Sequence, residues 1–459
     1  MISDRFNSIL GTANKIADKF KEHNKDLYLV GGSVRDILID SEKPLYDLDY
    51  TTNARPGEIS KILSELTNSL WKQGIEFGTV GCLFEGFRHE ITTFRQEAYI
   101  PESRKPAVIF GESLEVDLSR RDFTINTIAL DLSNMEIIDP YNGRSDLERA
   151  VLKTPLSPEI SFSDDPLRML RAARFISSHN VVPVEELVNA VQMLNDRINV
   201  VSKERIREEL DKLLTTENPS NGLWFIVYNG LSAHFLPELD ALKLEQDPIH
   251  KHKDVLAHTI AVVSKTSPNK ITRLSALFHD IGKPKTRSFS PQGVSFHHHD
   301  VVGAKMTRKR MAALRYSKED IEKVSKLVFL HLRFHTYRFG WTDKAVRRYA
   351  KDAGDLLLEL NELTRCDCTT QNENKARELA QRMDELERRL DELAEKEELS
   401  KLRPELDGEE VMEVLDLKPS KQVGVALDWL MELRLDEGLL GSDEVKHRLV
   451  EWWNKEQHS

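Results

Sequence analysis

Residues 29–36 read LVGGSVRD, so that two apolar residues, a glycine pair and a polar run follow one another directly. The apolar start predicts the end of a β-strand, and the glycines predict a turn from that strand into a helix. Glycines let the backbone approach a phosphate closely, and the first turn of a helix offers unpaired N–H donors. Gly31 and Gly32 are therefore candidates to bind a triphosphate, with the Arg35 guanidinium as a clamp. An ordinary strand-to-helix turn would explain the same residues.

A pair of aspartates, Asp47 and Asp49, follows in a β-like stretch eleven residues after the turn. Residues i and i+2 of a strand point the same way, so the two carboxylates should project together. Such a pair is costly without a cation and supplies the oxygen ligands that Mg²⁺ prefers, which would allow in-line displacement at phosphorus. We predict that both are catalytic magnesium ligands. Glu90, on another predicted strand, is the candidate third carboxylate, although a cross-strand salt bridge explains it equally well.

The surrounding chain changes character once along its length. From Leu27 to about Asp139, short β-rich runs alternate with turns around one helical segment, which predicts an α+β domain with a mixed sheet. After Pro166 the pattern is helical almost without interruption, and prolines and glycines around 217–248 mark a boundary. The predicted domains are a head at 1–150, an all-α neck at 151–245, a histidine-rich helical body at 246–370 and a helical tail at 371–459.

Length and charge limit the functions open to the chain. Its 459 residues exceed one hydrophobic core and predict two to four domains. The net charge of −11 offers no global attraction for a polyanion, so any contact with nucleic acid must be local. Basic runs at 305–310 and 344–351 are candidates, but solvated helix surfaces explain such runs equally well.

Nothing in the sequence predicts export or contact with a membrane. No apolar run approaches the roughly 18 residues needed to cross a bilayer, and the N-terminus lacks the apolar core of a secretory signal. Three cysteines, Cys82, Cys366 and Cys368, cannot form a disulfide framework, and we expect buried, ordinary thiols. A cytoplasmic protein without an obligate protein partner is therefore expected.

The segment 164–175, DDPLRMLRAARF, predicts a helix capped by Asp165. Arg168, Arg171 and Arg174 follow at i+3 spacing and share one face. A carboxylate accepts hydrogen bonds from an exocyclic amine, and a guanidinium donates to ring nitrogens and carbonyls. Asp165 and Arg168 could therefore read a base edge as a pairing partner does, with the other arginines on phosphates. Alternatively, Asp165 only caps the helix and the arginines form surface salt bridges.

Five motifs occur in one order along the chain, namely GGSVRD, DLD, RRDFTIN, DPYNGRSDL and DDPLRMLRAARF. Together they resemble the motifs of class II tRNA nucleotidyltransferases, the family of the bacterial CCA-adding enzymes, over residues 27–215. The resemblance implies a polymerase-β-like nucleotidyltransferase head. It also implies template-independent addition of CCA to the 3′ acceptor end of tRNA from CTP and ATP with Mg²⁺, releasing pyrophosphate.

The resemblance also implies roles for individual residues. It implies that Asp165 and Arg168 select CTP or ATP, with Arg171 and Arg174 near the nucleotide. The chain departs from the family at Asp164, where glutamate is typical, a conservative change that leaves the two selecting residues intact.

The RRDFTIN motif implies a further part of the nucleotide site. Arg121, Asp122 and Asn126 would lie around the ribose and phosphates. The alternative is that these residues brace the junction between head and neck.

A series of histidines and aspartates runs through the body, and imidazole with carboxylate suits a divalent metal. The series resembles the HD-superfamily phosphohydrolases. That resemblance implies metal-activated water acting on a phosphoester, such as a 2′,3′-cyclic phosphate, with a metal of unknown identity. The implied ligands are His258, His279, Asp280, His299, His331 and Asp367. His335 could take the fifth position in place of His331. A structural relic of such a site is an alternative to an active site.

Other activities remain open at this point. A poly(A) polymerase or an enzyme that adds only CC or only A would keep most of the motifs. We favour CCA addition because the HD series is present and residues 371–459 are acidic on balance. From another class, the chain could be an HD phosphohydrolase with an RNA-binding head. An RNA-binding scaffold without chemistry would leave the paired carboxylates unexplained.

Overall fold

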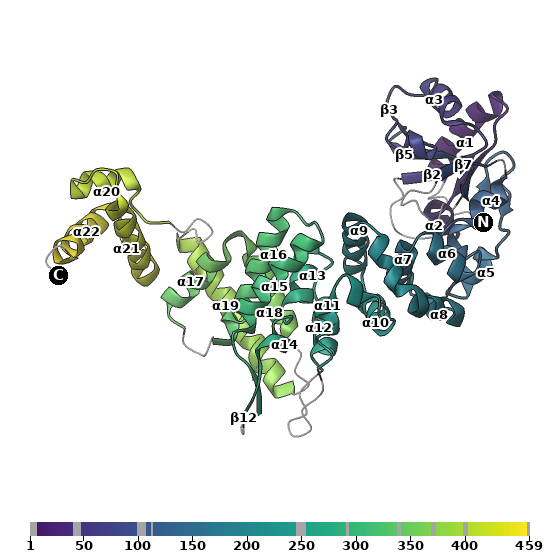
Figure 1. Ribbon diagram of the computed structural model, residues 1–459. Coiled ribbons are helices and arrows are strands. Elements are labelled where there is room, and N and C mark those ends of the chain that lie inside the picture. Colours follow the sequence, from purple (N-terminus) through teal and green to yellow (C-terminus); the bar gives the residue numbers. More distant parts are fainter. Residues whose placement is uncertain are drawn as a thin grey trace. The chain divides into compact units, whose positions relative to one another are not determined.

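The computed structural model divides into two compact units, Met1–Phe235 and Leu236–Ser459 (Figure 1). The division falls within the stretch 217–248, where prolines and glycines predict a boundary. None of the helices in the described ranges is long and apolar enough to cross a lipid bilayer. The structure describes residues 7–39, 47–98, 107–111, 113–244, 254–290, 293–336, 341–368, 373–397 and 403–456.

A seven-stranded mixed sheet forms the centre of the first unit, in the order β3-β4-β5-β2-β1-β8-β9. The β2–β5 pair is parallel and the other pairs are antiparallel. The predicted mixed sheet is therefore present. Its strands are β1 (Leu27–Val30), β2 (Asp47–Thr52), β3 (Leu70–Trp71), β4 (Thr79–Phe84), β5 (Phe87–Thr93), β8 (Ala129–Asp131) and β9 (Ile137–Ile138).

Alternation along β2 decides which face of the sheet carries the acids. Leu48 and Tyr50 are buried in the head core, where helices α1 (Asn7–Glu22) and α3 (Pro56–Ser64) pack on the sheet. Asp47 and Asp49 alternate with them and point to the opposite, more exposed face, because successive side chains of a strand point to opposite faces. Hydrophobic burial of two residues thus sets the direction of the two carboxylates.

Short elements connect the sheet to the helices that follow. A separate hairpin pairs β6 with β7, and a short parallel pair joins β10 to β11, a strand pair that the helical pattern did not predict. The elements are α2 (Gly32–Leu38), β6 (Arg95–Ala98), β7 (Ala107–Phe110), α4 (Leu114–Ser119), η3 (Thr124–Asn126), α5 (Gly143–Glu148), β10 (Val151–Leu152), α6 (Pro158–Asp164) and β11 (Val182–Pro183).

The remainder of the first unit is helical, as predicted. Helix α7 packs against α9 and α10, and Ser202 caps the N-terminus of α9. The helices are α7 (Leu167–His179), α8 (Glu185–Leu194), α9 (Lys203–Leu214) and α10 (Ser220–Tyr228).

The second unit is built around packed helices that carry the histidine series. The pairs α15–α16, α13–α16 and α12–α13 form its centre, and α18 packs on α12 and α13. A hairpin of β12 and β13 was not predicted from the sequence. The elements are α11 (Pro237–Asp240), α12 (Val255–Lys265), α13 (Lys270–Phe278), α14 (Lys283–Thr286), β12 (Arg287–Ser290), β13 (Gly293–Phe296), α15 (His299–Ala313), α16 (Lys318–Leu330), α17 (Asp343–Ala353) and α18 (Leu357–Asp367).

A long helix, α19 (Glu373–Glu397), packs on α17 and α18. Met383 and Leu386 are buried on its inner face, so this face packs on the chain's own helices. The last three helices enclose a small core of their own, and of the three cysteines only Cys82 is fully buried. These helices are α20 (Gly408–Leu415), α21 (Lys421–Glu437) and α22 (Ser442–Glu456).

The contact between α7 and α10 gives a test of the packing. A Cβ added at Gly222 would lie 2.3 Å from the Ala173 carbonyl oxygen and 2.5 Å from Leu213 Cδ1. Gly222→Ala should therefore destabilise the first unit by about 1–3 kcal/mol, measured by urea unfolding. Gly11→Ala is the control, because nothing lies within 4 Å of an added Cβ there and α1 should gain stability. Equal unfolding midpoints for the two variants would contradict this packing.

Candidate active site and histidine centre

The predicted magnesium ligands share one row of the sheet with Glu90. In the parallel β2–β5 pair, Asp49 lies opposite Glu90 and Asp47 lies opposite Arg88. Side chains of residues that pair across strands lie on the same face, so Asp49 and Glu90 are side by side. The structure therefore brings the three candidate carboxylates to one surface.

The charges in this row favour a cation. Burial raises the pKa of Asp49; Arg121 opposes the rise, whereas Glu90 and Asp47 add to it. Arg88 lies 3.6 Å from both Asp47 and Glu90, through Nε and Nη2 respectively. Arg88 is therefore the salt-bridge partner that the alternative explanation of Glu90 requires. The single exposed guanidinium of Arg88 still leaves Asp49 beside the negative charge of Glu90. A divalent ion would relieve that repulsion.

The glycine turn lies directly against this row. Gly31 has a φ of 73°, a conformation that favours glycine, and α2 begins at the next residue. A Cβ at Gly31 would lie 3.4 Å from Arg121 Nη1 and 3.8 Å from Asp49 Oδ2. The absence of a side chain therefore keeps open the space between the turn, Arg121 and the carboxylates.

The other predicted nucleotide-site residues form a buried chain of hydrogen bonds. Arg35 Nη1 donates to Asn126 Oδ1 at 2.7 Å, Asn126 Nδ2 donates to Asp122 Oδ1 at 2.9 Å, and Arg171 Nε donates to Asp122 Oδ2 at 2.9 Å. Burial alone would raise the pKa of Asp122, but Arg171 and the Asn126 hydrogen bond lower it to about 2. The chain joins α2, η3 and α7, which is the bracing arrangement considered as the alternative.

Arg168 and Asp165 lie at the start of α7 but have different surroundings. Arg168 is buried, and it donates to Ser161 Oγ at 2.9 Å and to the Arg120 carbonyl oxygen. Asp165 follows α6 and is not the N-cap of α7 as predicted, because Pro166 holds that position. One Asp165 oxygen accepts a hydrogen bond from the Leu167 N–H, and the other pairs with Arg205 at 2.7 Å. The Arg168 guanidinium is thus held by two partners, whereas the Asp165 carboxylate pairs with the exposed Arg205, which another donor could replace.

Three guanidiniums gather around one aromatic ring. Phe175 is buried, and the guanidinium carbons of Arg174, Arg35 and Arg171 lie 4.5, 5.5 and 5.9 Å from its centroid. Arg174 also pairs with the buried Glu209. The arginines are therefore held together in place by acids and by cation–π contacts.

Asp117 is a buried residue that sequence analysis missed. Its carboxylate accepts hydrogen bonds from Thr51, the Arg95 N–H, Arg120 and Arg121. It thereby ties α4 to β2, two residues beyond Asp49, and holds Arg121 near the turn. The only sequence signal was its i,i+4 spacing to Arg121, which is common on helices.

The histidine series converges on one centre in the second unit. His258 Nε2 lies 2.9 Å from Asp367 Oδ1 and 3.2 Å from His279 Nε2. Asp280 lies 3.2 Å from His279 and 3.4 Å from His299. The side chain of His335, the alternative ligand, lies outside the described residues.

Two groups of ligand atoms in the described chain lie within 4.8 Å of one another, and both belong to this centre. The head carboxylates do not form such a group. One group contains His258, His279 and Asp280, and the other contains Asp280, His299 and His331.

Ring orientation at this centre suits metal coordination. The Nδ1 atoms of His279, His299 and His331 hydrogen-bond to backbone carbonyls at 2.6–2.7 Å. Among the described residues, the buried Nε2 atoms of His299 and His331 have no hydrogen-bond partner. A proton on Nδ1 leaves Nε2 free to bind a metal, and backbone carbonyls commonly fix this tautomer. The donor set therefore fits a divalent cation.

Charges around the centre are closely coupled. Burial would lower the pKa of His279, but Asp280 and Asp367 raise it to about 10. Burial and the neighbouring His279 lower the pKa of His331 to about 4. Lys283 Nζ lies 2.5 Å from Asp280 Oδ2 and adds a further positive charge beside the shared carboxylate.

Three family models match the chain. They are the "Poly A polymerase head domain" at 27–153, the "Probable RNA and SrmB-binding site of polymerase A" at 184–243 and the "HD domain" at 255–389. Proteins of the head and HD families typically depend on divalent metals. The presence of a head domain and of an HD domain, inferred from sequence motifs, is therefore confirmed.

Several curated relatives are similar over about half of this chain. CCA-adding enzymes of Lactobacillus delbrueckii subsp. bulgaricus and Limosilactobacillus reuteri are 36% and 38% identical over 233 and 225 residues. These stretches cover 50% and 49% of this chain, and 57% and 54% of the relatives. The chain thus matches little more than half the length of these relatives. The resemblance to the class II tRNA nucleotidyltransferases is confirmed.

Solved structures extend the likeness in fold to almost the whole chain. The Bacillus stearothermophilus CCA-adding enzyme in complex with CTP has a TM-score of 0.73 and 23% identity, covering 99% of both chains. A Thermotoga maritima CCA-adding enzyme complexed with tRNA has a TM-score of 0.53 and 19% identity, covering 97% of this chain and 96% of that one. At these identities they establish the fold, an α+β head followed by helical domains.

The buried Asp122 carboxylate predicts a pH dependence of stability. Its pKa of about 2 in the folded chain lies below the usual unfolded value of about 3.9. The contribution of Asp122 to the free energy of unfolding is therefore present above pH 4. It is lost as the pH falls toward 2, a change of about 2–3 kcal/mol. Urea unfolding of Asp122→Asn between pH 7 and 3 should show less loss of stability on acidification than the parent. An exposed control, Glu148→Gln, should follow the parent, and an unchanged slope in Asp122→Asn would refute this role.

Metal content will test the histidine centre. The full chain, loaded with Mn²⁺ or Co²⁺ and desalted, should retain bound metal by elemental analysis. His331→Gln and Asp280→Asn should each weaken binding at least tenfold, because each removes a ligand. His335→Gln should retain metal. Loss of metal in His335→Gln with retention in His331→Gln would assign the fifth position to His335 instead.

Proposed function

We propose that this chain, which carries the head, RNA-binding and HD domains found above, adds CCA to the 3′ end of tRNA without a template. The observation that carries the proposal is the row formed by Asp47, Asp49 and Glu90 beside the Gly31 turn. CTP and ATP would donate nucleotides to the terminal hydroxyl, and pyrophosphate would leave. The similar CCA-adding enzymes named above support this choice.

Asp47 and Asp49 would hold Mg²⁺, with Glu90 as the third carboxylate. When bound, the metal would activate the attacking 3′ hydroxyl and neutralise charge on the leaving pyrophosphate. Arg121, held by Asp117 next to Gly31, would donate hydrogen bonds to the triphosphate. Arg88, which is exposed and lies at 3.6 Å, can leave the carboxylates when a metal binds.

Nucleotide choice would rest on Asp165 and Arg168. Arg168 is held by Ser161 and the Arg120 carbonyl, so its position stays fixed during selection. Asp165 can exchange the exposed Arg205 for the exocyclic amine that cytosine and adenine share. Arg171 and Arg174 would place positive charge near the nucleotide, whereas the Arg35–Asn126–Asp122 chain would keep the site rigid.

The tRNA acceptor end would be recognised mainly by backbone and shape, as duplex RNA generally is. The helical regions after the head would make that contact, including the RNA-binding match at 184–243. Such an enzyme would meet tRNA in the cytoplasm, the compartment expected from the sequence. Addition of only CC, only A or a poly(A) tail remains the alternative within the same chemistry.

A second activity follows from the histidine centre. His258, His279, Asp280, His299, His331 and Asp367 would hold a divalent metal. The bound metal would supply an activated water for a phosphoester such as a 2′,3′-cyclic phosphate. Lys283, beside Asp280, would offer positive charge to the phosphate. The buried Nε2 of His331, which has no hydrogen-bond partner among the described residues, favours this activity over a structural relic.

Primer extension decides between the products. The full chain is incubated with Mg²⁺, labelled CTP or ATP, and tRNAs that end before C, after CC or after CCA. Products that stop at CCA are expected. A long A-tail would indicate a poly(A) polymerase, and no extension with retained phosphohydrolase activity would favour the HD alternative.

Substitutions in the same assay test the carboxylates. Asp47→Asn and Asp49→Asn should each lower the extension rate at least about 100-fold, which corresponds to roughly 3 kcal/mol in the barrier. Glu85→Gln, which changes an exposed acid in the turn between β4 and β5, should leave the rate unchanged. Full activity in either aspartate variant would remove that residue from the metal site.

A further inference from the structure

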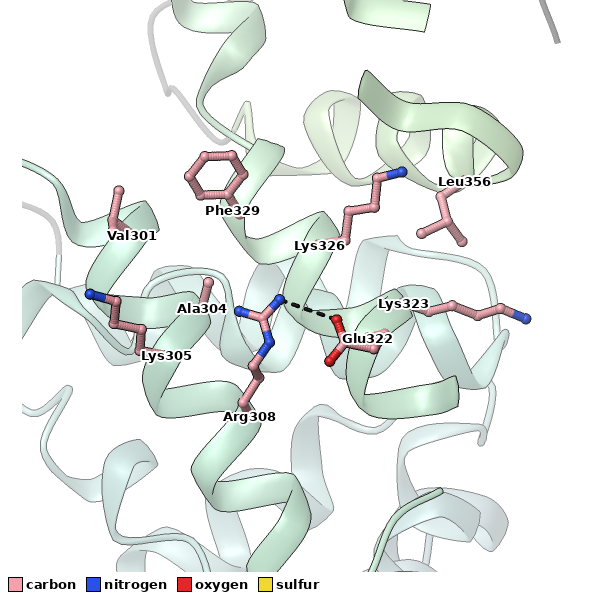
Figure 2. Close-up of a pocket in the computed structure, with 9 residues that line it drawn as sticks. All are labelled: Val301, Ala304, Lys305, Arg308, Glu322, Lys323, Lys326, Phe329 and Leu356. Atoms are coloured by element: carbon pink, nitrogen blue, oxygen red, sulfur yellow. Dashed lines mark hydrogen bonds and ion pairs between the residues drawn. The ribbon is translucent and has the colours of Figure 1, made fainter. Parts of the chain in front are cut away.

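A groove lies between helices α15 and α16 of the second unit, and Leu356 also lines it (Figure 2). Its volume is about 490 Å³, within the range of sites that bind small organic ligands. On α15, Ala304 and Lys305 line the groove, whereas His299 begins the same helix with its ring in the histidine centre. The groove is therefore separate from the metal centre and from the head site.

The groove offers an apolar surface with an aromatic ring. Val301 and Ala304 come from α15, Phe329 comes from α16, and Leu356 precedes α18. The Phe329 residue is 39% exposed, so its ring can contact a ligand. A planar aromatic group such as a nucleobase could stack there.

Positive charge surrounds this surface. Arg308 pairs with Glu322 at 3.3 Å, as Figure 2 shows, and Lys323 pairs with Glu319 at 2.5 Å. Lys305 and Lys326 have no carboxylate within 4.0 Å among the residues that the structure describes. The lining therefore holds two ammonium groups that lack an anionic partner, one on each helix.

We propose that this groove binds a nucleoside polyphosphate, with its base on Phe329 and its phosphates between Lys305 and Lys326. Inorganic phosphate would leave the apolar surface uncovered, and an uncharged aromatic ligand would leave both lysines unpaired. A ligand with a planar base and at least two negative charges matches both features and the volume. This second nucleotide site would be additional to the one proposed in the head.

Equilibrium dialysis of the full chain with labelled ATP tests the proposal. Two bound ATP molecules per chain are expected. The double variant Lys305→Glu with Lys326→Glu should bind one, with at least tenfold weaker binding at the second site. Lys309→Glu with Lys318→Glu is the matched control, because it changes one exposed lysine on each of the same helices outside the groove. The control should bind two, and thermal melting should confirm that both variants fold.

Photo-crosslinking with 8-azido-ATP then locates the second molecule. Labelled peptides from α15 or α16 are expected, and they should disappear in the groove variant alone. Equal ATP binding by the parent and the groove variant, or labelling confined to the first unit, would overturn the proposal. Tripolyphosphate that competes as well as ATP would overturn the base-stacking part. Weaker tRNA binding with unchanged ATP binding in the groove variant would assign the lysines to RNA contact instead.

The test does not depend on the proposed tRNA activity. Extension of tRNA is not its readout, and the groove variants leave the head carboxylates intact. A chain that adds no nucleotides could still bind ATP in the groove, and an active enzyme could lack the second site.

Discussion

The buried carboxylate of Asp122 is the constraint on which the first unit depends. A charge without contact with water is tolerated only when partners replace the lost hydration, and Arg171 and Asn126 do so. Those partners come from α7 and η3, and Arg35 extends the chain to α2. One ionised group therefore fixes three elements that border the glycine turn. Removing a single partner would leave the remaining buried charges uncompensated. A buried hydrogen-bond network of this kind therefore stabilises the fold only when every member has its partners.

The elements fixed by Asp122 border the sheet that carries the acidic row. The β2–β5 pair sets the direction of the acids, but the space above them is bounded by Gly31 and Arg121. Asp117 links Arg121 to Thr51, so the arginine is positioned by the same strand that carries Asp49. The acidic row and its cationic neighbour thus move together as one body.

Much of this arrangement could be predicted from local patterns. The alternation around Asp47 and Asp49 gives a strand with both acids on one face, and residues 203–214 have clear helical periodicity. The register between β2 and β5 could not be predicted, because it depends on pairing between segments that are distant in sequence. The spacing of Arg168 suggested the same face as its neighbours, but Ser161 on α6 draws its guanidinium inward. The hairpin of β12 and β13 was missed because each strand has only four residues, too few for the alternation of Phe289, Val294 and Phe296 with serines to be distinctive.

The three histidines whose Nδ1 atoms bind carbonyls share one further property. In each case the carbonyl belongs to the residue three positions earlier, namely Ala276, Phe296 or Val328. Each ring is therefore oriented by its own segment of backbone and needs no second side chain from elsewhere. The packing of the helices then sets the distances between these rings, whose orientations are already fixed by the local backbone. The ring orientations at the centre are thus encoded in short, independent stretches of sequence, so each ring keeps its direction without help from the helix surfaces around it.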